Sequence, residues 1–131
     1  MNGCCRNDKA RRGGLWEGLG GEFFSGRVEA FLLTLEGEGS SGPHGMLHTG
    51  QEFVYCVQGK LEYQVESQIF TMETGDSLLF AAQLRHSWRN PGGMVTNALI
   101  LITDHAEADR GLDLHWGEDG SSEDDVVEEE V

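Results

Sequence analysis

Short runs of alternating apolar and polar residues dominate the chain between residues 28 and 103. The clearest run is 60–66, in which Leu61, Tyr63 and Val65 alternate with polar or charged neighbours. Successive side chains of a β-strand point to opposite faces, so this period of two predicts half-buried antiparallel strands. The same reasoning predicts strands at 28–35, 52–58, 60–66, 68–72, 77–81, 86–89 and 94–103. No helix of ordinary length competes with them, and we expect an all-β fold.

Turn-forming residues separate these runs at short intervals. A Gly/Ser loop spans 37–42, Gly59 suits a hairpin tip, Gly75 lies in a tight reversal and 90–93 contains one Pro and two Gly. Such residues favour turns because they accept or impose the backbone angles that turns need. Closely spaced strands with turns of this kind predict a sandwich or a barrel. Segment 106–116 stays open between a final strand and a short helical turn that covers a barrel end.

Charge is unevenly distributed along the 131 residues, whose formal net charge is −14. Residues 1–14 carry four cations and one acid, whereas residues 117–131 carry eight acids and no base. We therefore expect a disordered basic arm at 1–14, one barrel domain at 15–116 and a disordered acidic tail at 117–131. The domain offers no basic stripe for phosphates, so neither nucleic acid nor an anionic membrane is an expected partner of this chain alone.

The cysteines indicate a reducing compartment, and the hydropathy of the chain indicates a soluble protein. Cys4 and Cys5 are adjacent and Cys56 stands alone in an apolar run, so the three do not form a disulfide framework. No apolar stretch resembles a signal-peptide core, and none approaches the roughly 20 residues that span a bilayer. We expect a cytoplasmic protein.

Three residues stand out as candidate metal ligands, namely His48, Glu52 and His86. Gly50 breaks the chain between the first two, so a hairpin could bring both side chains into one interior, and His86 begins a later predicted strand. Two neutral imidazoles and one carboxylate can occupy one face of an octahedron and leave positions for substrate. The bare residues alone favour a plainer interpretation, in which the histidines end strands in solvent and Glu52 is one more surface acid.

Two motifs with fixed internal spacings favour the metal-site interpretation instead. They read His48-x3-Glu52-x6-Gly59 and Gly75-x5-Ala81-x-Gln83-x2-His86-x3-Asn90, with fifteen residues between them. Their spacings resemble the two motifs of the cupin superfamily over residues 16 to 103, with Ala81 and Gln83 where proline and glycine are usual. The resemblance implies a double-stranded β-helix, also called a jelly-roll barrel. More narrowly, the segments around both motifs look like the cupin domains that follow helix-turn-helix regions in bacterial (XRE-like) regulators.

The resemblance also implies the ligands. His48, Glu52 and His86 match the family's metal-binding positions, but Met46 stands where the pattern has a further histidine. The remaining set is similar to that of the mononuclear iron epoxidase of the fosfomycin pathway, which implies a divalent ion such as iron, manganese, nickel or zinc. His44 is a candidate fourth ligand, with a rim or loop histidine as the alternative.

A pocket beside the triad follows from strand alternation, which places a largely apolar set on the interior face: Met46, Val54, Cys56, Trp88 and Asn90. We expect a small-molecule-binding cupin with a divalent metal, forming a homodimer. Catalysis stays open, with oxygenation or isomerisation at the metal favoured over nucleophilic hydrolysis. The alternative is a metal-free effector-binding module that lacks its own DNA-binding domain.

Overall fold

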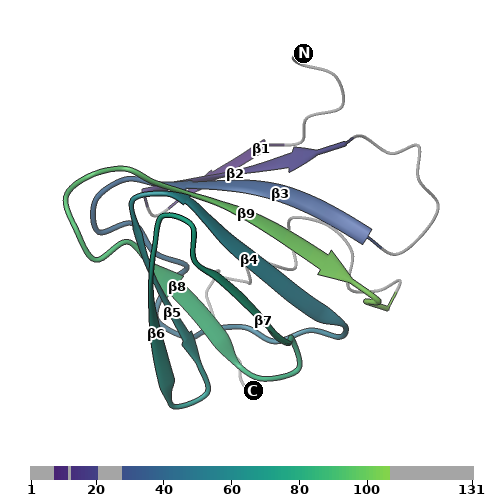
Figure 1. The fold of residues 1–131 in the computed structure, drawn as a ribbon. Coiled ribbons are helices and arrows are strands. Elements are labelled where there is room, and N and C mark those ends of the chain that lie inside the picture. Colours follow the sequence, from purple (N-terminus) through teal and green to yellow (C-terminus); the bar gives the residue numbers. More distant parts are fainter. Residues whose placement is uncertain (1–7, 12, 21–27, 107–131) are drawn as a thin grey trace.

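Nine antiparallel strands in two sheets make up the part of the chain that the computed structural model describes, residues 8–11, 13–20 and 28–106 (Figure 1). The large sheet has the order β1-β2-β3-β9-β4-β7, and the small sheet has the order β6-β5-β8. The strands are β1 (Asp8–Arg11), β2 (Gly14–Leu19), β3 (Val28–Leu35), β4 (Gln51–Gln58), β5 (Lys60–Val65), β6 (Gln68–Glu73), β7 (Ser77–Ala81), β8 (His86–Arg89) and β9 (Thr96–Thr103).

The seven predicted strands correspond to β3 through β9, and their ends differ from the prediction by at most two residues. Within the segment predicted to be a disordered basic arm, Asp8–Arg11 instead form β1, which pairs with β2 and places Arg11 opposite Gly14. The rest of that arm up to residue 7, the segment from 107 to 116 and the acidic tail at 117–131 lie outside the described residues.

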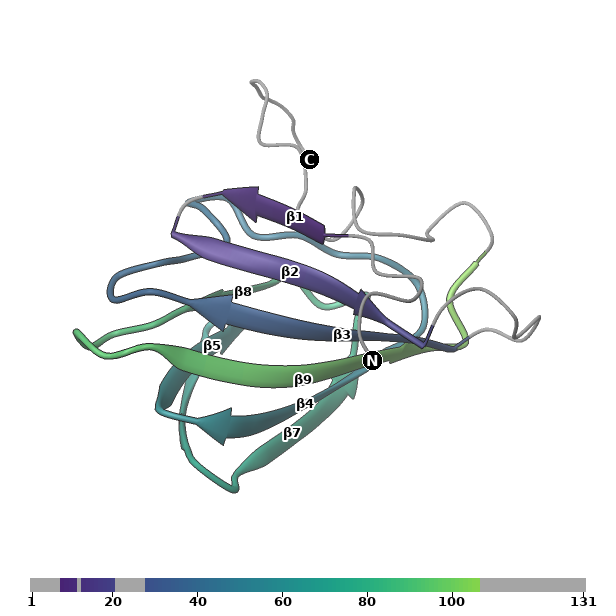
Figure 2. The ribbon, with the colours of Figure 1, turned by 90° about the horizontal axis from the view of Figure 1, so that it is seen from above.

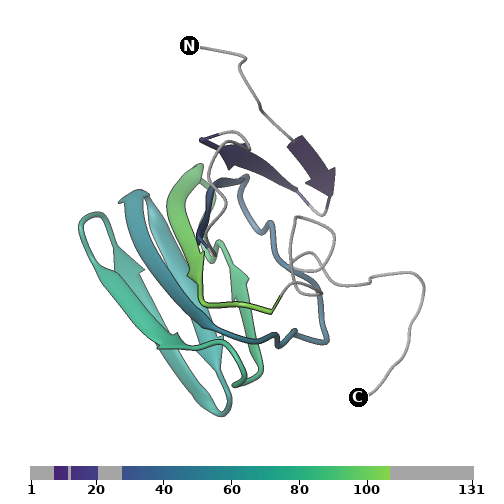
Figure 3. The same ribbon diagram turned by 90° about the vertical axis from the view of Figure 1, so that its right-hand side faces the viewer.

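The two sheets enclose the core between them. Figure 2 shows β2, β3, β9, β4 and β7 side by side across the large sheet, and Figure 3 shows the small sheet against it from the side. Every second residue of β9 is buried, as expected for a strand with one face on a core. Trp16 from the large sheet stacks on Trp88 from the small sheet, with ring centroids 5.5 Å apart. The all-β jelly-roll expectation is thereby confirmed.

The described residues contain no helix that is long and apolar enough to cross a membrane.

Candidate metal centre

Three buried side chains meet inside the barrel where the two sheets face one another. His48 precedes β4, Glu52 is the second residue of β4, and His86 opens β8. Glu52 Oε1 lies 3.3 Å from His48 Nε2 and 3.2 Å from His86 Nε2. The candidate ligand atoms of the three residues all lie within 4.8 Å of one another. The structure therefore brings the three sequence-predicted ligands into one group that could hold a metal ion.

Gly50 makes the turn that places His48 and Glu52 on the same side. Its φ of 88° lies in the left-handed region, and a Cβ atom there would lie 2.2 Å from the Thr103 carbonyl oxygen. Backbone hydrogen bonds on both sides of the turn hold it against Ala82, from His48 N–H to the Ala82 carbonyl and from Ala82 N–H to the Gly50 carbonyl. No residue with a side chain fits at position 50 without displacing β9.

Backbone carbonyls orient both imidazole rings. His48 Nδ1 lies 2.9 Å from the Thr49 carbonyl oxygen, and His86 Nδ1 lies 2.7 Å from the Leu84 carbonyl oxygen. A carbonyl oxygen can only accept, so each Nδ1 must carry the hydrogen. A neutral ring then directs the lone pair of its Nε2 toward the Glu52 carboxylate. This is the tautomer that metal-binding histidines adopt when the other ring nitrogen is held by a backbone carbonyl.

The electrostatics of the group follow from that orientation. Two Nε2 lone pairs and a carboxylate oxygen converge in a buried space, and like partial charges at about 3 Å repel one another strongly where water is excluded. A cation relieves the repulsion, supplied either by a metal ion or by protons on the imidazoles. Two imidazole nitrogens and one carboxylate oxygen suit iron, manganese, nickel and zinc. The donor set therefore fits a divalent metal.

Tyr63 on β5 is a site residue that the sequence prediction missed. Its hydroxyl donates a hydrogen bond to Glu52 Oε2, the oxygen that does not face the histidines. Burial raises the pKa of Tyr63 well above its usual value, and the charge of Glu52 and the hydrogen bond to it add to the rise, so the phenol keeps its proton. The pattern of 60–66 placed Tyr63 on the buried face, where a hydroxyl requires a polar partner.

Aromatic rings surround His86 inside the barrel. The Tyr63 ring lies nearly parallel to the imidazole, with centroids 6.5 Å apart, and the Phe80 ring from β7 approaches its edge at 4.9 Å. The His48 ring lies 5.3 Å from the His86 ring in an edge-on arrangement. These contacts restrict the rotation of the imidazole and keep its surroundings apolar.

The structure separates His44 from the group. The His44 side chain is exposed, and its backbone carbonyl accepts a hydrogen bond from Arg85. The geometry therefore does not support His44 as a fourth ligand. It agrees with the alternative prediction, a histidine in a loop. Met46 is buried instead, and its backbone exchanges two 2.8 Å hydrogen bonds with His86. The side chain at position 46 thus belongs to the immediate surroundings of the triad.

The other predicted pocket residues are buried. Val54, Cys56 and Trp88 belong to the hydrophobic core. Burial raises the pKa of the Cys56 thiol and the charge of Asp76 adds to the rise, while a hydrogen bond to the Gln58 backbone opposes it. Asn90 has a turn-holding role, since the two hydrogens of its side-chain amide are directed at Met94 and, in a shared hydrogen bond, at Leu35 and Glu36, whose carbonyl oxygens accept them.

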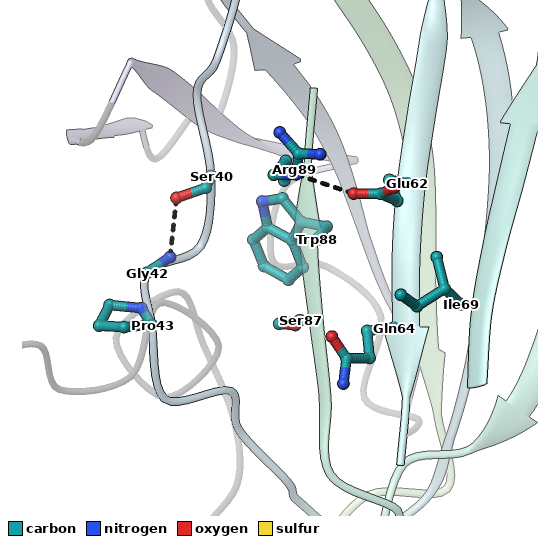
Figure 4. A pocket seen from close by; sticks show the side chains of 9 residues that line it. All are labelled: Ser40, Gly42, Pro43, Glu62, Gln64, Ile69, Ser87, Trp88 and Arg89. Atoms are coloured by element: carbon teal, nitrogen blue, oxygen red, sulfur yellow. Dashed lines mark hydrogen bonds and ion pairs between the residues drawn. The ribbon is translucent and has the colours of Figure 1, made fainter. Parts of the chain in front are cut away.

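A groove of about 530 Å³ lies away from the triad, on the outer side of the small sheet (Figure 4). The loop that contains Ser40 and Pro43 forms one wall, and Gln64 and Ile69 lie across from it. The groove includes a surface ion pair between Arg89 and Glu62 at 2.8 Å, of the kind that contributes little to stability. Of the predicted pocket residues only Trp88 lines this groove.

Comparisons with known proteins agree with the geometry. Residues 31–102 match a family model described as the cupin domain. The Cupin_2 domain of an XRE family transcriptional regulator from Enterobacter cloacae superposes with a TM-score of 0.63 and 18% identity, over 70% of this chain and 96% of that one. A Cupin 2 conserved barrel domain protein from Salinispora arenicola gives a TM-score of 0.63 and 19% identity, over 75% and 82% of the two chains.

A third solved structure, titled a sugar phosphate isomerase of the cupin superfamily from Silicibacter pomeroyi, gives a TM-score of 0.59 and 23% identity. The match covers 70% of this chain but only 59% of that one. At these identities the structural matches establish the fold alone. No protein of curated function matches the chain.

Proposed function

The chain belongs to the cupin domain family, and on that premise we propose that it binds a small molecule in its barrel beside a divalent metal ion held by His48, Glu52 and His86. The convergence of the two Nε2 atoms on Glu52 Oε1 carries this proposal. Iron, manganese, nickel and zinc all accept such ligands. A metal at this position would supply Lewis acidity and open coordination positions for a substrate.

The surrounding residues support such a centre in distinct ways. The carbonyls of Thr49 and Leu84 hold the two rings with Nε2 toward Glu52. Tyr63 engages one carboxylate oxygen and leaves the other facing the histidines. Groups of this kind fix the orientation and the basicity of metal ligands. If the protein is an enzyme, we propose oxygenation or isomerisation of the bound molecule; one protein of the same fold is titled a sugar phosphate isomerase.

Metal analysis of protein purified without an affinity tag tests the proposal. We expect about one equivalent of metal in the wild type and a loss of roughly 90% or more in His48→Ala and Glu52→Ala, since ligand removal abolishes such sites. His44→Ala is the matched control, because that histidine is exposed and outside the group. Less than about a tenth of an equivalent in wild-type protein after metal supplementation would refute the proposal.

Met46 favours a second candidate, a metal-free module that binds an effector. Thioether sulfur is a poor ligand for hard divalent ions, and Met46 occupies the family's first histidine position beside His86. The similar barrel from Enterobacter cloacae is titled a domain of a transcriptional regulator. Protons on the imidazoles would then supply the positive charge near Glu52. In this alternative the barrel recognises a small molecule without chemistry at a metal.

Ligand-induced stabilisation distinguishes the two candidates. A ligand at 100 times its dissociation constant adds ~2.7 kcal/mol to the free energy of unfolding. In a metabolite panel read by thermal shift, stabilisation that persists in chelator and in His48→Ala favours the metal-free module. Stabilisation that disappears in both favours the metal centre.

Met46→His adds a gain-of-function arm to the same experiments. The new imidazole would project beside His86, so metal affinity should rise by at least ~10-fold if the triad already binds an ion. If only the Met46→His protein retains metal and the wild type does not, the wild type is the metal-free module.

A further inference from the structure

The groove on the outer side of the small sheet has the size of a small-molecule site. Its volume of about 530 Å³ lies within the range of roughly 300–1,000 Å³ that is usual for ligand pockets. Its base is a cross-strand row that runs from Ile69 on β6 through Gln64 on β5 to Ser87 on β8. Tyr63 and His86 occupy the buried inner face of the same strands, so the groove is separate from the metal centre.

The wall of the groove is the segment 42–45, which follows an isolated bridge between Ser40 and β8. Two hydrogen bonds hold this segment in place. Gly42 N–H donates to the Ser40 hydroxyl oxygen at 3.1 Å, as Figure 4 shows. The Arg85 guanidinium donates to the His44 carbonyl oxygen at 3.2 Å. A wall that is fixed before binding loses little conformational freedom to a ligand, which favours affinity.

Hydrogen-bonding groups at the base of the groove are available to a ligand. Among the residues that the structure describes, the half-buried Ser87 hydroxyl makes no hydrogen bond. The Gln64 side chain uses only its amide nitrogen, which donates to the Glu66 carbonyl, and its amide oxygen is free to accept. A ligand group that both donates and accepts would satisfy the hydroxyl and the amide together. Hydroxyl groups have that property.

The ion pair at one end of the groove offers a donor and an acceptor side by side. Arg89 Nε lies 2.8 Å from Glu62 Oε1, and Arg89 Nη1 lies 3.5 Å from Glu38 Oε1. Within the described part of the chain, Arg89 Nη2 and Glu62 Oε2 have no other partner. One hydroxyl can donate to the carboxylate while its neighbour accepts from the guanidinium, which is the pairing that two adjacent hydroxyls of a sugar provide.

The charge balance of the groove argues against an anionic ligand. Glu62 and Glu38 accompany Arg89 at one end, and the Glu66 carboxylate accepts a hydrogen bond from the backbone of Arg85 at the other. Three carboxylates therefore accompany two guanidinium groups, on a chain whose net charge is −14. Phosphate and carboxylate ligands gain no excess positive charge here.

Apolar surface flanks the polar base on two sides. Pro43 is exposed on the wall, and Ile69 is 57% exposed on β6 across from it (Figure 4). Ligand sites commonly combine apolar contacts with a few polar groups that fix orientation. A sugar ring carries hydroxyls along its edge and C–H groups on its faces, so it matches both kinds of surface.

We propose that this groove binds a neutral saccharide. Gln64, Ser87 and Glu62 contact its hydroxyls, and its C–H surface lies between Pro43 and Ile69. The site is distinct from small-molecule binding in the barrel and needs no metal ion. A groove this open leaves much of the ligand in water, so we expect a Kd on the order of 1 mM.

Two-dimensional 1H–15N NMR of the full chain, titrated with glucose, galactose, maltose and lactose, tests the proposal and locates the site. With ~50 mM sugar the groove should approach saturation for at least one of the four. We expect the amide signals of Ser40, Gln64 and Ser87 to shift while those of Glu52 and Ile100 do not. The same shifts should occur in chelator, so loss of the metal centre would leave this result unchanged.

Single substitutions in the base of the groove provide the second measurement. Gln64→Ala and Ser87→Ala should each weaken binding about 5-fold, the usual effect of removing one hydrogen bond. Both variants should fold normally, as circular dichroism will check, because Gln64 is exposed and Ser87 makes no hydrogen bond among the described residues. Gln83→Ala is the matched control, since Gln83 is an exposed glutamine outside the groove, and it should bind like the wild type.

Three results would overturn the proposal. The first is the absence of shifts with all four neutral sugars at ~50 mM. The second is a set of shifts confined to barrel residues such as Glu52, or wild-type affinity in both Gln64→Ala and Ser87→Ala, because the sugar would then bind elsewhere. The third is tighter binding of glucose 6-phosphate than of glucose, which would make the groove an anion site. Weaker binding of the phosphate ester supports a neutral ligand.

Discussion

Replacing Tyr63 with phenylalanine tests whether Glu52 is held as a buried carboxylate. Tyr63→Phe deletes one hydroxyl and keeps the ring, which packs against Phe80 and Trp88 and lies parallel to His86. Glu52 is completely buried, so water cannot replace the lost donor at Oε2. A hydrogen bond to a charged group contributes about 1.5–3 kcal/mol, and a buried acceptor left without its donor retains the full desolvation cost.

We therefore expect metal-free Tyr63→Phe to lose about 2 kcal/mol of a total stability on the order of 5–15 kcal/mol. For a domain of this size that loss lowers the melting temperature by roughly 8–16 °C. Urea unfolding in chelator, followed by tryptophan fluorescence, measures the change. Tyr55→Phe is the control, because Tyr55 lies on the outer face of β4 and surface changes rarely exceed about 0.5 kcal/mol.

The same variant should weaken metal binding 10- to 100-fold, the usual effect of losing a group that orients a ligand. Competition with a chromophoric chelator measures that affinity. If Tyr63→Phe matched the wild type within about 0.5 kcal/mol in urea and also bound metal normally, the Tyr63 hydroxyl would have no role in holding Glu52.

The Gly50 turn, the buried Cys56 thiol and the ionisation of Tyr63 can each be tested separately. Gly50→Ala should destabilise the protein by at least ~2 kcal/mol more than Gly75→Ala in urea unfolding. Both glycines have φ near 90°, but only a Cβ at position 50 would meet the Thr103 carbonyl oxygen. Equal destabilisation by the two substitutions would exclude this clash. Cys56 should react with iodoacetamide at pH 8 at least ~100-fold more slowly in the folded protein than in urea, because burial raises its thiol pKa, and fast native labelling would contradict this. Because the folded pKa of Tyr63 lies well above the ordinary 10.0, its stabilising contribution is complete below pH 10 and is lost as pH rises further, so metal-free wild type should lose more stability than Tyr63→Phe above pH 10.

Strand alternation and turn chemistry predict most of the barrel because each signal is local. β5 shows this clearly, since Leu61, Tyr63 and Val65 are buried as the period of two requires. β1 and β2 carry no such signal. β1 reads Asp-Lys-Ala-Arg, a sequence of low strand propensity, and β2 contains Gly14 and Gly18. Their pairing with one another and with β3 decides their structure, and charged residues suit the edge position that β1 occupies.

Local sequence patterns likewise predict only part of the candidate site. The spacing of His48 and Glu52 around a glycine is visible in the sequence, and so is the later His86. The alternation that put His44 beside Met46 assumed a regular strand, but Ser40 and Met46 form only isolated bridges. Gly42 and Gly45 have φ values of 103° and 70°, so the chain turns between them and carries His44 to the surface. Local periodicity cannot predict such a reversal.

Tyr63 and Asn90 show a second limit of local patterns. Both occupy buried positions that alternation predicts, yet the partner of each polar group comes from elsewhere in the chain. The Tyr63 hydroxyl reaches Glu52 across the two sheets, and the Asn90 amide reaches the Leu35 carbonyl from 55 residues away. A buried polar side chain implies a hydrogen-bond partner, because a buried polar group without one is costly. Only the folded structure identifies that partner.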